Sequence, residues 1–436
     1  MSDLNIFQKR RAQLANKLPM NSIALIPAAK ELLRNGDAHY RFRQDSDFYY
    51  LTGFEEPDAL LVLFAGASAE TVLFNRAHNP EQEQWTGRRL GQDGACEVLN
   101  IDRAYAIDCL DQELPALLCD SDVIYFPVGR YPEWDKRVLA LWNKTKGFVR
   151  DGKNSPEAFF DVAEIIAEMR VIKSACEIKC MQYAADASIA AHKRAMRACK
   201  NTRYEYELEA ELTYALSLRG CRGHAYDPIV AGGENACILH YIENNQKLNK
   251  GDLVLIDAGA EYQNYASDIT RTFPVNGTFS AEQKAIYSLV LAAQEAAFAC
   301  IRPGACWNDM QQTTVRVLTA GLVDLGLLHG DVDELIAIQA YKPFYMHRVG
   351  HWLGLDVHDS GRYMHDNVWR KLEADMVFTV EPGLYISKNM PGVDERWWGI
   401  GVRIEDDVRV TKNGYDVFSD ALPTAIDEVE ALVRDE

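Results

Sequence analysis

Hydrophobic residues along this chain fall into two kinds of runs, short continuous ones and longer ones with helical spacing. The short runs SIALIP, at residues 22–27, and DALLVLF, at residues 58–64, are typical of buried strands. Helical and strand-like runs alternate up to about residue 150. This alternation predicts an α/β domain in the N-terminal part of the chain.

The stretch VRDGKNSPEAFF, at residues 149–160, is polar and contains glycine and proline, as connections between domains often are. A helix through EIIAEM follows it, and Ser174 with Glu177 then forms a capping box that opens a further helix. A length of 436 residues also exceeds the usual size of a single core. We therefore expect two domains, at residues 1–172 and 173–436.

The second domain alternates long helical runs with pairs of strand-like runs. Leu208, Leu212 and Leu216 lie on one face of a predicted helix, and Gly220 is placed to end it. Ser280 with Gln283 forms a second capping box after the first pair of strands. We expect these leucines to form core. The pattern favours an α+β architecture for this domain.

The first pair of strand-like runs contains two aspartates, Asp257 in VLIDAG and Asp268 in ASDITRTF. The turn-forming stretch GAEYQN separates the runs, which predicts a β-hairpin over residues 253–273. If the register is symmetric about that turn, the two aspartates lie directly opposite each other, with Cβ atoms roughly 5 Å apart. Oxygens placed in this way can share a pair of ions.

The second pair contains two glutamates, Glu381 in MVFTVEPGLYIS and Glu405 in GIGVRIEDDVRV. Pairing symmetric about the intervening loop sets these acids across from each other. Any single acid in an apolar run is most simply a paired core charge. Four of them together indicate a cation site, because an uncompensated buried carboxylate costs several kcal/mol.

The run MHRVGHWLGLDVHD carries three histidines, His347, His351 and His358. Their spacing of four and seven would align them on one helix face, but the two glycines in the run disfavour a helix. Arg348 also occupies the position where the zinc-protease helix motif requires glutamate. We expect a looped segment with His351 as a metal ligand and the other two as accessory residues.

Oxygen ligands with one imidazole favour Mn²⁺ or another hard divalent ion, although Zn²⁺ and Co²⁺ also suit such a set. A pair of metal ions about 3.5 to 4 Å apart lowers the pKa of a shared water and polarises the bond under attack. Hydrolysis is therefore the expected chemistry. The expected ligands are Asp257, Asp268, His351, Glu381 and Glu405.

These runs, in the order Asp, Asp, His, Glu, Glu, resemble the pita-bread metallopeptidase family of aminopeptidase P, prolidase and methionine aminopeptidase. The matching contexts are LIDAGAEYQNYASDITRTF, HWLGLDVHD, TVEPGLYI and GVRIEDD. Upstream, GFEEPDALLVLF and EQWTGRRLGQD are similar to the N-terminal domain of bacterial aminopeptidase P. The resemblance implies a pita-bread catalytic domain with internal pseudo-two-fold symmetry, and hydrolysis of the bond before a proline at the second position of a peptide.

The resemblance also suggests how the ligands are shared. Asp268 and Glu405 would bridge two metals, with Asp257 on one ion and His351 and Glu381 on the other. Glu381 would carry a proton to the leaving proline nitrogen, which has no N–H of its own.

Five residues outside the expected ligand set receive substrate or supporting roles. His358 is expected to support the developing oxyanion. Arg403, two residues before Glu405 on a strand, is expected to orient a ligand carboxylate rather than form a surface salt bridge. The resemblance places His240 and His347 near the substrate, and Trp85 as an aromatic that closes the pocket.

One position departs from the family pattern. Similar bacterial sequences have an arginine where Asn367 falls, so Arg362 or Arg370 supplies the charge in a realigned loop, or recognition of longer peptides differs. Prolidase, which cleaves dipeptides, and a non-catalytic peptide-binding module remain alternatives to an aminopeptidase. Methionine aminopeptidase is disfavoured because such enzymes usually lack a large N-terminal domain.

Composition limits the partners and the compartment. A formal net charge of −18 disfavours nucleic-acid and anionic-membrane partners. The opening residues lack the apolar core of a secretion signal, and no apolar stretch reaches the length of a membrane span. The ten cysteines show no framework spacing, so we expect reduced, mostly buried thiols in a cytoplasmic protein. Related enzymes suggest a homo-oligomer, either a dimer or a tetramer.

Overall fold

The computed structural model describes residues 4–66 and 69–435, and the chain divides into two compact units after Met169. The sequence-based boundary at residue 172 lies slightly further along and stays a prediction. The elements up to the division are α1 Leu4–Lys17, β1 Ser22–Pro27, β2 Leu33–Asn35, β3 Ala38–His39, α2 Ser46–Thr52, β4 Leu60–Phe64, β5 Thr71–Asn75, α3 Pro80–Thr86, α4 Gly91–Leu99, β6 Arg103–Ala106, α5 Leu110–Leu118, β7 Val123–Phe126, α6 Pro132–Thr145, β8 Ala158–Asp161 and α7 Ala163–Val171, which crosses it.

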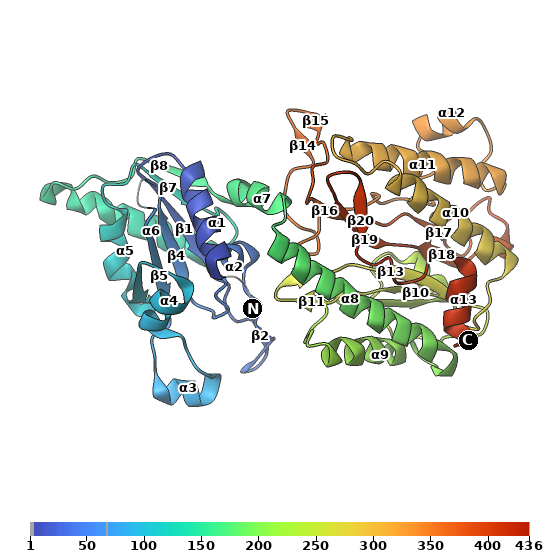
Figure 1. Ribbon diagram of the computed structural model, residues 1–436, viewed down its shortest axis with the longest axis horizontal. Helices are drawn as coiled ribbons and strands as arrows, with labels where there is room; N and C mark the ends of the chain where they lie inside the picture. Colours follow the sequence, from blue (N-terminus) through green and yellow to red (C-terminus); the bar gives the residue numbers. More distant parts are fainter. Residues whose placement is uncertain (1–3, 67–68, 436) are drawn as a thin grey trace. The chain divides into compact units, whose positions relative to one another are not determined.

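The first unit is built on a six-stranded mixed sheet with the strand order β6-β5-β4-β1-β7-β8. Both continuous apolar runs form central strands, because β1 is SIALIP and β4 is LLVLF. Ile23 and Leu25 of β1 pack with the core that includes α5 and α6, while helices α1 and α2 lie across the opposite face (Figure 1). The predicted α/β class of this unit is confirmed.

The stretch VRDGKNSPEAFF is not the connection that its composition indicates. Its last residues form strand β8, which pairs in parallel with β7 at the edge of the sheet. The chain leaves the first unit through α7 instead. A polar, glycine-containing run therefore covers both a loop and an edge strand, and composition does not separate the two.

The second unit holds the predicted alternation of long helices and strand pairs. Its elements are α8 Ala175–Ala198, α9 Glu205–Leu218, β9 Ile229–Gly232, β10 Leu253–Asp257, β11 Glu261–Tyr262, β12 Tyr265–Ala266, β13 Thr270–Pro274, α10 Ala281–Phe298, α11 Trp307–Asp324, α12 Val332–Ala337, β14 Met364–His365, β15 Val368–Trp369, β16 Val377–Val380, β17 Gly383–Ile386, β18 Ile400–Arg403, β19 Asp406–Val410, β20 Tyr415–Val417 and α13 Ile426–Arg434.

Two long helices precede each acid-bearing hairpin in this unit, so its two halves repeat the same order of elements. Helices α8 and α9 come before the β10–β13 pair, and α10 and α11 come before the strands β16 to β19. Figure 1 shows the strands between the α8–α9 pair and the α10–α11 pair. This repeated order confirms the expected internal pseudo-symmetry, and the main apolar core fills the space between helices and strands.

Local sequence signals set the helix ends as predicted. Ser174 and Ser280 each form a capping box, at the starts of α8 and α10. The three leucines of α9 are buried. Gly220 follows that helix with a positive φ of 77°, a conformation that glycine adopts without strain. These helices form the outer wall behind the acid-bearing strands.

The first acid-bearing hairpin differs in register from the symmetric pairing. Asp257 is paired with Thr270 and not with Asp268. The reason is the tip, a two-residue turn at Gln263 and Asn264 in which both residues have positive φ. A shift of two residues keeps both aspartates on the same face, because side chains alternate with a period of two.

A close backbone approach allows this register. Hydrogen bonds from Ala258 N to Ile269 O, and from Ser267 N to Ala260 O, place Gly259 opposite Asp268. A Cβ atom on Gly259 would lie 1.7 Å from the Ser267 carbonyl oxygen. Only glycine therefore fits beside the second aspartate.

The second acid-bearing hairpin has the expected register. Val380 pairs with Asp406, and Gly383 pairs with Arg403. Continuing either ladder sets Glu381 opposite Glu405, which is the predicted arrangement. Glu405 also forms an isolated bridge to Thr270, and its N–H donates to the Thr270 carbonyl at 3.1 Å. This bridge joins the two hairpins at the level of the acids.

Two further expectations can be compared with the described residues. All ten cysteines have free thiols, but only Cys119, Cys199 and Cys221 are buried. The expectation that most are buried was therefore wrong. None of the helices within residues 4–66 and 69–435 has the length and hydropathy needed to cross a bilayer.

Candidate metal centre

The five predicted ligands line one cavity of about 740 Å³ in the second unit. Asp268, His351 and Glu405 each offer a ligand atom, and these atoms lie within 4.8 Å of one another. The Nε2 atom of His351 is 3.4 Å from Asp268 Oδ2 and 3.4 Å from Glu381 Oε1. Asp257 is connected to Asp268 through the hydroxyl of Tyr226, as described below. The structure thus brings the whole predicted set together.

The segment around His351 is a loop and not a helix, as expected. His351 Nδ1 lies 3.0 Å from the carbonyl oxygen of Trp352, which can only accept a hydrogen bond. The proton of a neutral ring therefore resides on Nδ1. Nε2 is left with its lone pair directed at the carboxylates, which is the arrangement of a metal-ligating histidine.

The carboxylates carry the electrostatic signature of a cation site. Burial raises the pKa of Glu405 far above its usual value, and the charges of Asp268 and Glu381 raise it further. Burial likewise raises the pKa of Glu381 to about 7. Burial opposes the charged form of His351, but the Asp268 hydrogen bond and the charge of Glu381 outweigh it and raise this pKa to about 9.

This donor set fits hard divalent cations. Four crowded carboxylates repel one another in a buried site, and bound cations would remove that repulsion. Carboxylate oxygens with one imidazole match the preferences of such ions. The shifted pKa values belong to the metal-free protein, so metal binding would displace protons from this site.

Arg403 contacts a predicted ligand directly. Its Nη2 donates to Asp257 Oδ2 at 2.6 Å, and its Nη1 donates to the Tyr385 hydroxyl at 3.0 Å. Arg403 is 4% exposed, so this contact is a buried ion pair and not a surface salt bridge. The guanidinium fixes the orientation of the Asp257 carboxylate.

His347 continues the same chain of hydrogen bonds. Its Nδ1 lies 2.7 Å from the carbonyl oxygen of Arg348, so it donates there, and its Nε2 accepts from the Tyr385 hydroxyl at 2.8 Å. Burial and, to a smaller extent, the charge of Arg403 lower the pKa of His347 to about 4. The ring is therefore neutral at neutral pH.

The other two predicted histidines also line the cavity. Both side chains are exposed. The ring of His358 contacts the ring of His351 edge to face, with centroids 4.2 Å apart. His240 enters from the loop after β9, while His358 belongs to the His351 loop. A ligand in the cavity would thus meet two imidazoles from different segments.

Three supporting residues escaped the sequence analysis. The hydroxyl oxygen of Tyr226 lies 2.5 Å from both Asp257 Oδ1 and Asp268 Oδ1. Thr270 Oγ1 donates to Glu405 Oε2 at 2.6 Å. The carboxylate of Asp407 accepts the backbone N–H of Asp268 at 3.1 and 3.2 Å. Each of them orients a predicted ligand, as supporting partners in metal sites do.

Two of these three residues could have been predicted from the strand pattern in the sequence. Thr270 follows Asp268 by two positions in a strand, and Asp407 follows Glu405 in the same way. A period of two predicts a shared face, so both were within reach of the strand pattern. Tyr226 lies in an irregular segment before β9, where no periodicity places its side chain.

Trp85 does not line this cavity, which is built by the second unit. It belongs to α3 in the first unit, and it is 89% exposed in the single chain. Its assignment as a pocket aromatic stays a prediction.

The departure at Asn367 has a local structural explanation. Asp366 and Asn367 form the two-residue turn between β14 and β15, and both have positive φ. Asparagine tolerates that conformation better than arginine does. Of the two candidate replacements, Arg362 lines the cavity that holds the predicted ligands, whereas Arg370 lines a neighbouring hollow.

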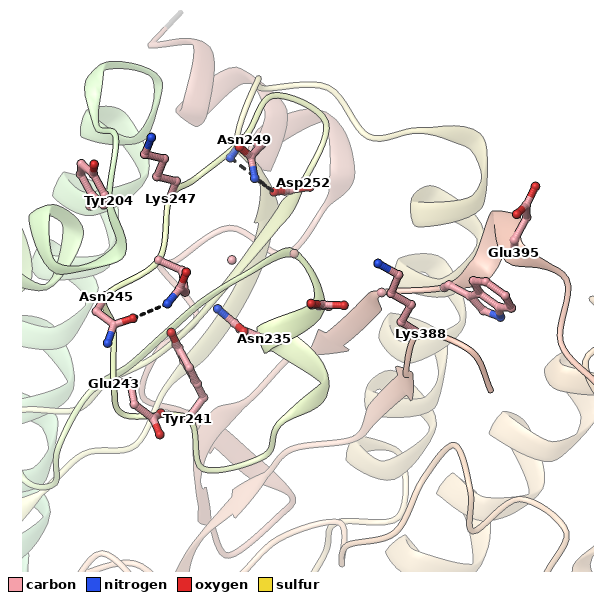
Figure 2. Close-up of a pocket in the computed structure, with 16 residues that line it drawn as sticks. Tyr204, Asn235, Tyr241, Glu243, Asn245, Lys247, Asn249, Asp252, Lys388 and Glu395 are labelled. Carbon is pink, nitrogen blue, oxygen red and sulfur yellow. Dashed lines mark hydrogen bonds between the residues drawn. The ribbon is translucent and has the colours of Figure 1, made fainter. Parts of the chain in front are cut away.

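A second and larger hollow, of about 1080 Å³, lies elsewhere on the same unit (Figure 2). It shares no lining residue with the first cavity. Its polar side chains bond to one another, as when Asn249 Nδ2 donates to Asp252 Oδ2 at 3.0 Å. No three of its acids form a metal-binding group among the described residues. Size alone therefore does not locate the chemistry.

Comparison with known proteins agrees with this geometry. Residues 179–412 match the model of metallopeptidase family M24, and residues 7–125 match the aminopeptidase P N-terminal domain. The chain belongs to metallopeptidase family M24. It is 46% identical to the Xaa-Pro aminopeptidase of Escherichia coli over 429 residues, which is 98% of this chain and 97% of that protein.

Solved structures extend the likeness of this M24 metallopeptidase to its whole fold. The structure of an aminopeptidase from Pseudomonas aeruginosa superposes with a TM-score of 0.97 at 50% identity, and 99% of each chain is covered. A zinc-substituted Escherichia coli aminopeptidase P in complex with product gives 0.97 at 45% identity, covering 99% of this chain and 98% of that one. The expected pita-bread fold is confirmed.

Proposed function

We propose that this M24 metallopeptidase is an Xaa-Pro aminopeptidase, which hydrolyses the bond between the first residue of a peptide and a proline at the second position. The observation that carries the proposal is the gathering of Asp268, His351 and Glu405 within 4.8 Å in one cavity. Near-full-length likeness to a protein named Xaa-Pro aminopeptidase supports the substrate class. A non-catalytic module would be expected to have lost several of the ligands, whereas this chain keeps all five.

We propose that the site holds two divalent cations, Mn²⁺ by preference, with Zn²⁺ or Co²⁺ as substitutes. Asp257, Asp268, His351, Glu381 and Glu405 would hold these ions. When bound, such ions supply an activated hydroxide at neutral pH and polarise the scissile carbonyl. The relative named for zinc substitution supports this tolerance of metals.

The protein contributes by holding its ligands in place. Arg403 keeps Asp257 oriented, and Thr270 keeps Glu405 oriented. The Trp352 carbonyl fixes the tautomer of His351. Because each ligand is held before substrate arrives, little reorganisation is needed during the reaction.

Glu381 is suited to move the proton. Its carboxylate lines the cavity 3.4 Å from His351 Nε2, where a substrate held at the metals would meet it. The nitrogen of a proline peptide bond has no hydrogen, so it leaves only after receiving a proton. We assign that delivery to Glu381, and oxyanion support to His358, with His240 and His347 completing the substrate wall.

Aromatic side chains supply the rest of the cavity. Trp307, Tyr363 and Trp369 line it together with Leu239 and Met364. Trp307 and Tyr363 pack against each other with ring centroids 4.9 Å apart. A proline ring is apolar and rigid, so a wall of this kind favours it and reduces the access of water.

The deciding experiment compares a tripeptide, Ala-Pro-Ala, with the dipeptide Ala-Pro, using manganese-loaded protein. We expect release of alanine from the tripeptide, and activity confined to the dipeptide would instead identify a prolidase.

Asp257→Ala and Glu405→Ala should abolish hydrolysis while leaving the fold intact. Glu395→Ala removes an acid of the second hollow and is the matched control, with full activity expected. Full activity of a verified Glu405→Ala protein would overturn the site.

We also propose a cytoplasmic homo-oligomer acting on peptides. The ten free thiols support a reducing compartment. Oligomeric state is measurable by sedimentation velocity. A single species at the mass of one chain would exclude the assembly.

A further inference from the structure

The loop that carries His240 forms part of the wall of both cavities. His240 lines the cavity with the predicted ligands, whereas the next residue, Tyr241, lines the second hollow (Figure 2). Between residues 238 and 247 only Tyr241 and Asn244 are buried. Because open space borders the loop on both sides, the position of His240 depends on the few contacts that these two buried side chains make.

Both buried side chains reach helix α9. The hydroxyl of Tyr241 donates to Glu205 Oε2 at 2.8 Å, and Asn244 Nδ2 donates to Glu209 Oε2 at 2.9 Å. The two glutamates are four positions apart, so they lie on the same face of the helix. Helix α9 therefore holds the loop at two points one turn apart, and the first point is next to His240 in the sequence.

Glu205 makes most of these contacts. Besides Tyr241, its carboxylate accepts Gly232 N at 2.8 Å, Asn235 Nδ2 at 2.9 Å and Gln246 N at 2.8 Å. All four donors line the second hollow (Figure 2). They come from both ends of the loop and from its middle. One carboxylate thus ties the whole segment from residue 232 to residue 246 together.

The chemistry of this position requires a carboxylate. Glu205 is fully buried, and the four groups that donate to it are uncharged. A carboxylate can accept from four donors at once, whereas the oxygen of a neutral amide accepts from two. Burial and the hydrogen bond to Glu205 raise the pKa of Tyr241 to about 12, so its hydroxyl stays protonated and donates. Glu205 also begins α9, where the free N–H groups of the helix favour a negative charge.

We propose that Glu205 is a positioning residue for hydrolysis, which holds the loop so that His240 faces a substrate at the metals. The inference rests on the proposed function, in which His240 forms part of the substrate wall. Glu205 itself does not line the cavity with the predicted ligands. Its contribution to turnover therefore passes through His240.

The test is a double-mutant cycle on kcat/KM for Ala-Pro-Ala with manganese-loaded protein. Glu205→Gln keeps the size of the side chain but replaces one acceptor oxygen with a donor, so a loop N–H or O–H loses its partner. We expect kcat/KM to fall about 10- to 100-fold, because a small displacement of a group beside the substrate has effects of this size. Mn²⁺ affinity should stay unchanged. In a His240→Ala background the same substitution should cause no further loss.

Tyr241→Phe provides a second, milder variant in case Glu205→Gln lowers stability. It removes one of the four donors and keeps the carboxylate, so its loss of kcat/KM should be smaller and should also vanish in the His240→Ala background. Glu207→Gln is the matched control with full activity expected. Glu207 lies in the same turn of α9, but its carboxylate accepts the N–H of Arg203 at 2.6 Å and not a group of the His240 loop.

The outcomes separate this inference from the proposed function. Unchanged kcat/KM in both Glu205→Gln and Tyr241→Phe would overturn the inference and leave Xaa-Pro hydrolysis established. Losses that add to that of His240→Ala would also overturn it, because they would show that Glu205 acts through general stability. Full activity of the His240→Ala protein would remove the residue through which Glu205 is proposed to act. Absence of hydrolysis by the unmodified protein would refute the proposed function itself.

Discussion

Thr270 shows how a single hydroxyl can serve two members of the metal site. It donates to Glu405 Oε2 at 2.6 Å and accepts from Arg403 Nε at 3.2 Å. One oxygen therefore links a bridging carboxylate to the arginine that orients Asp257. Its neighbour on the same strand face, Thr272, bonds through its hydroxyl to the backbone carbonyl and N–H of Arg403.

We expect Thr270→Val to weaken metal binding by about 10- to 100-fold, because the Glu405 carboxylate loses the group that orients it. Metal affinity is measured by isothermal titration of the chelator-treated protein. Thr272→Val is the matched control, since it removes a similar buried hydroxyl without touching a ligand. Equal losses of affinity in both variants would show that Thr270 acts only through general stability.

His192 is expected to destabilise the fold on acidification. It is fully buried, its Nε2 lies 2.9 Å from the Ala258 carbonyl, and burial lowers its pKa from 6.5 to about 4. The unfolded chain therefore takes up the proton first as the pH falls. The contribution of neutral His192 to the free energy of unfolding is complete above pH 6.5. It is lost progressively as the pH falls to 4, and the loss amounts to about 3 kcal/mol.

The prediction is tested by urea unfolding of metal-free protein between pH 4 and pH 7.5. His192→Gln keeps a donor for the Ala258 carbonyl but does not titrate in this range. Its free energy of unfolding should fall less steeply with decreasing pH than that of the unmodified protein. Parallel curves for the two proteins would assign the acid sensitivity to other groups.

At the scale of elements, the loop that joins His351 to His358 is held by a buried ionic cluster. Asp359 pairs with Lys173 Nζ at 2.8 Å and with Arg170. Arg170 and Lys173 come from the segment before α8, and all three charges are almost fully buried. The opening segment of the second unit thereby fixes the loop that presents both histidines.

We expect Asp359→Asn to lower the free energy of unfolding by about 3 to 5 kcal/mol, because the buried cations Lys173 and Arg170 each lose a buried ion-pair partner. Hydrolysis should fall as the histidine loop loses its anchor. Asp356→Asn is the control, since Asp356 pairs with the same Arg170 at 2.7 Å but its side chain is 44% exposed. Its loss should cost less than about 1 kcal/mol. Chemical denaturation measures both, and equal costs would contradict the argument.

The strand patterns predicted the ligands better than they predicted the pairing. Asp268 was assigned the wrong partner, because the φ-positive turn at Gln263 and Asn264 offsets the hairpin by two positions. The predicted ligand set is unaffected, because a register shift of two residues leaves both aspartates on the same face of the hairpin. Glu381 and Glu405 required no such correction. Register depends on turn conformation, which residue type alone does not fix.

Other features depend on contacts that no short pattern contains. Tyr226 reaches the two aspartates from an irregular segment, and Arg348 meets Trp369 from another loop. The exposed position of Trp85 likewise had no signal in its sequence neighbours. Periodicity places residues on faces of regular elements, whereas loop-to-loop contacts arise from tertiary packing.

At the scale of the whole molecule, the two compact units should respond differently to metal. The predicted ligands all belong to the second unit. Metal that binds only the folded state stabilises it by about 4 kcal/mol at a thousandfold excess over Kd. Chelation should therefore lower the melting temperature of the second unit and leave that of the first unchanged.

Differential scanning calorimetry with and without Mn²⁺ provides the measurement. In a scan of the full-length protein, the first unit gives a transition of its own. Equal shifts of both transitions would contradict the assignment of the metals to one unit. Addition of Mn²⁺ after chelation should restore the original scan.

The bridge between Thr270 and Glu405 joins two hairpins that are synthesised at different times. Its two partners are separated by 135 positions, so a growing polypeptide presents the first pair of acids long before the second pair exists. Metal binding needs both pairs of acids. The enzyme is consequently inactive toward surrounding peptides during its synthesis. Peptidase activity begins only when the hairpin with Glu381 and Glu405 packs against the hairpin with Asp257 and Asp268.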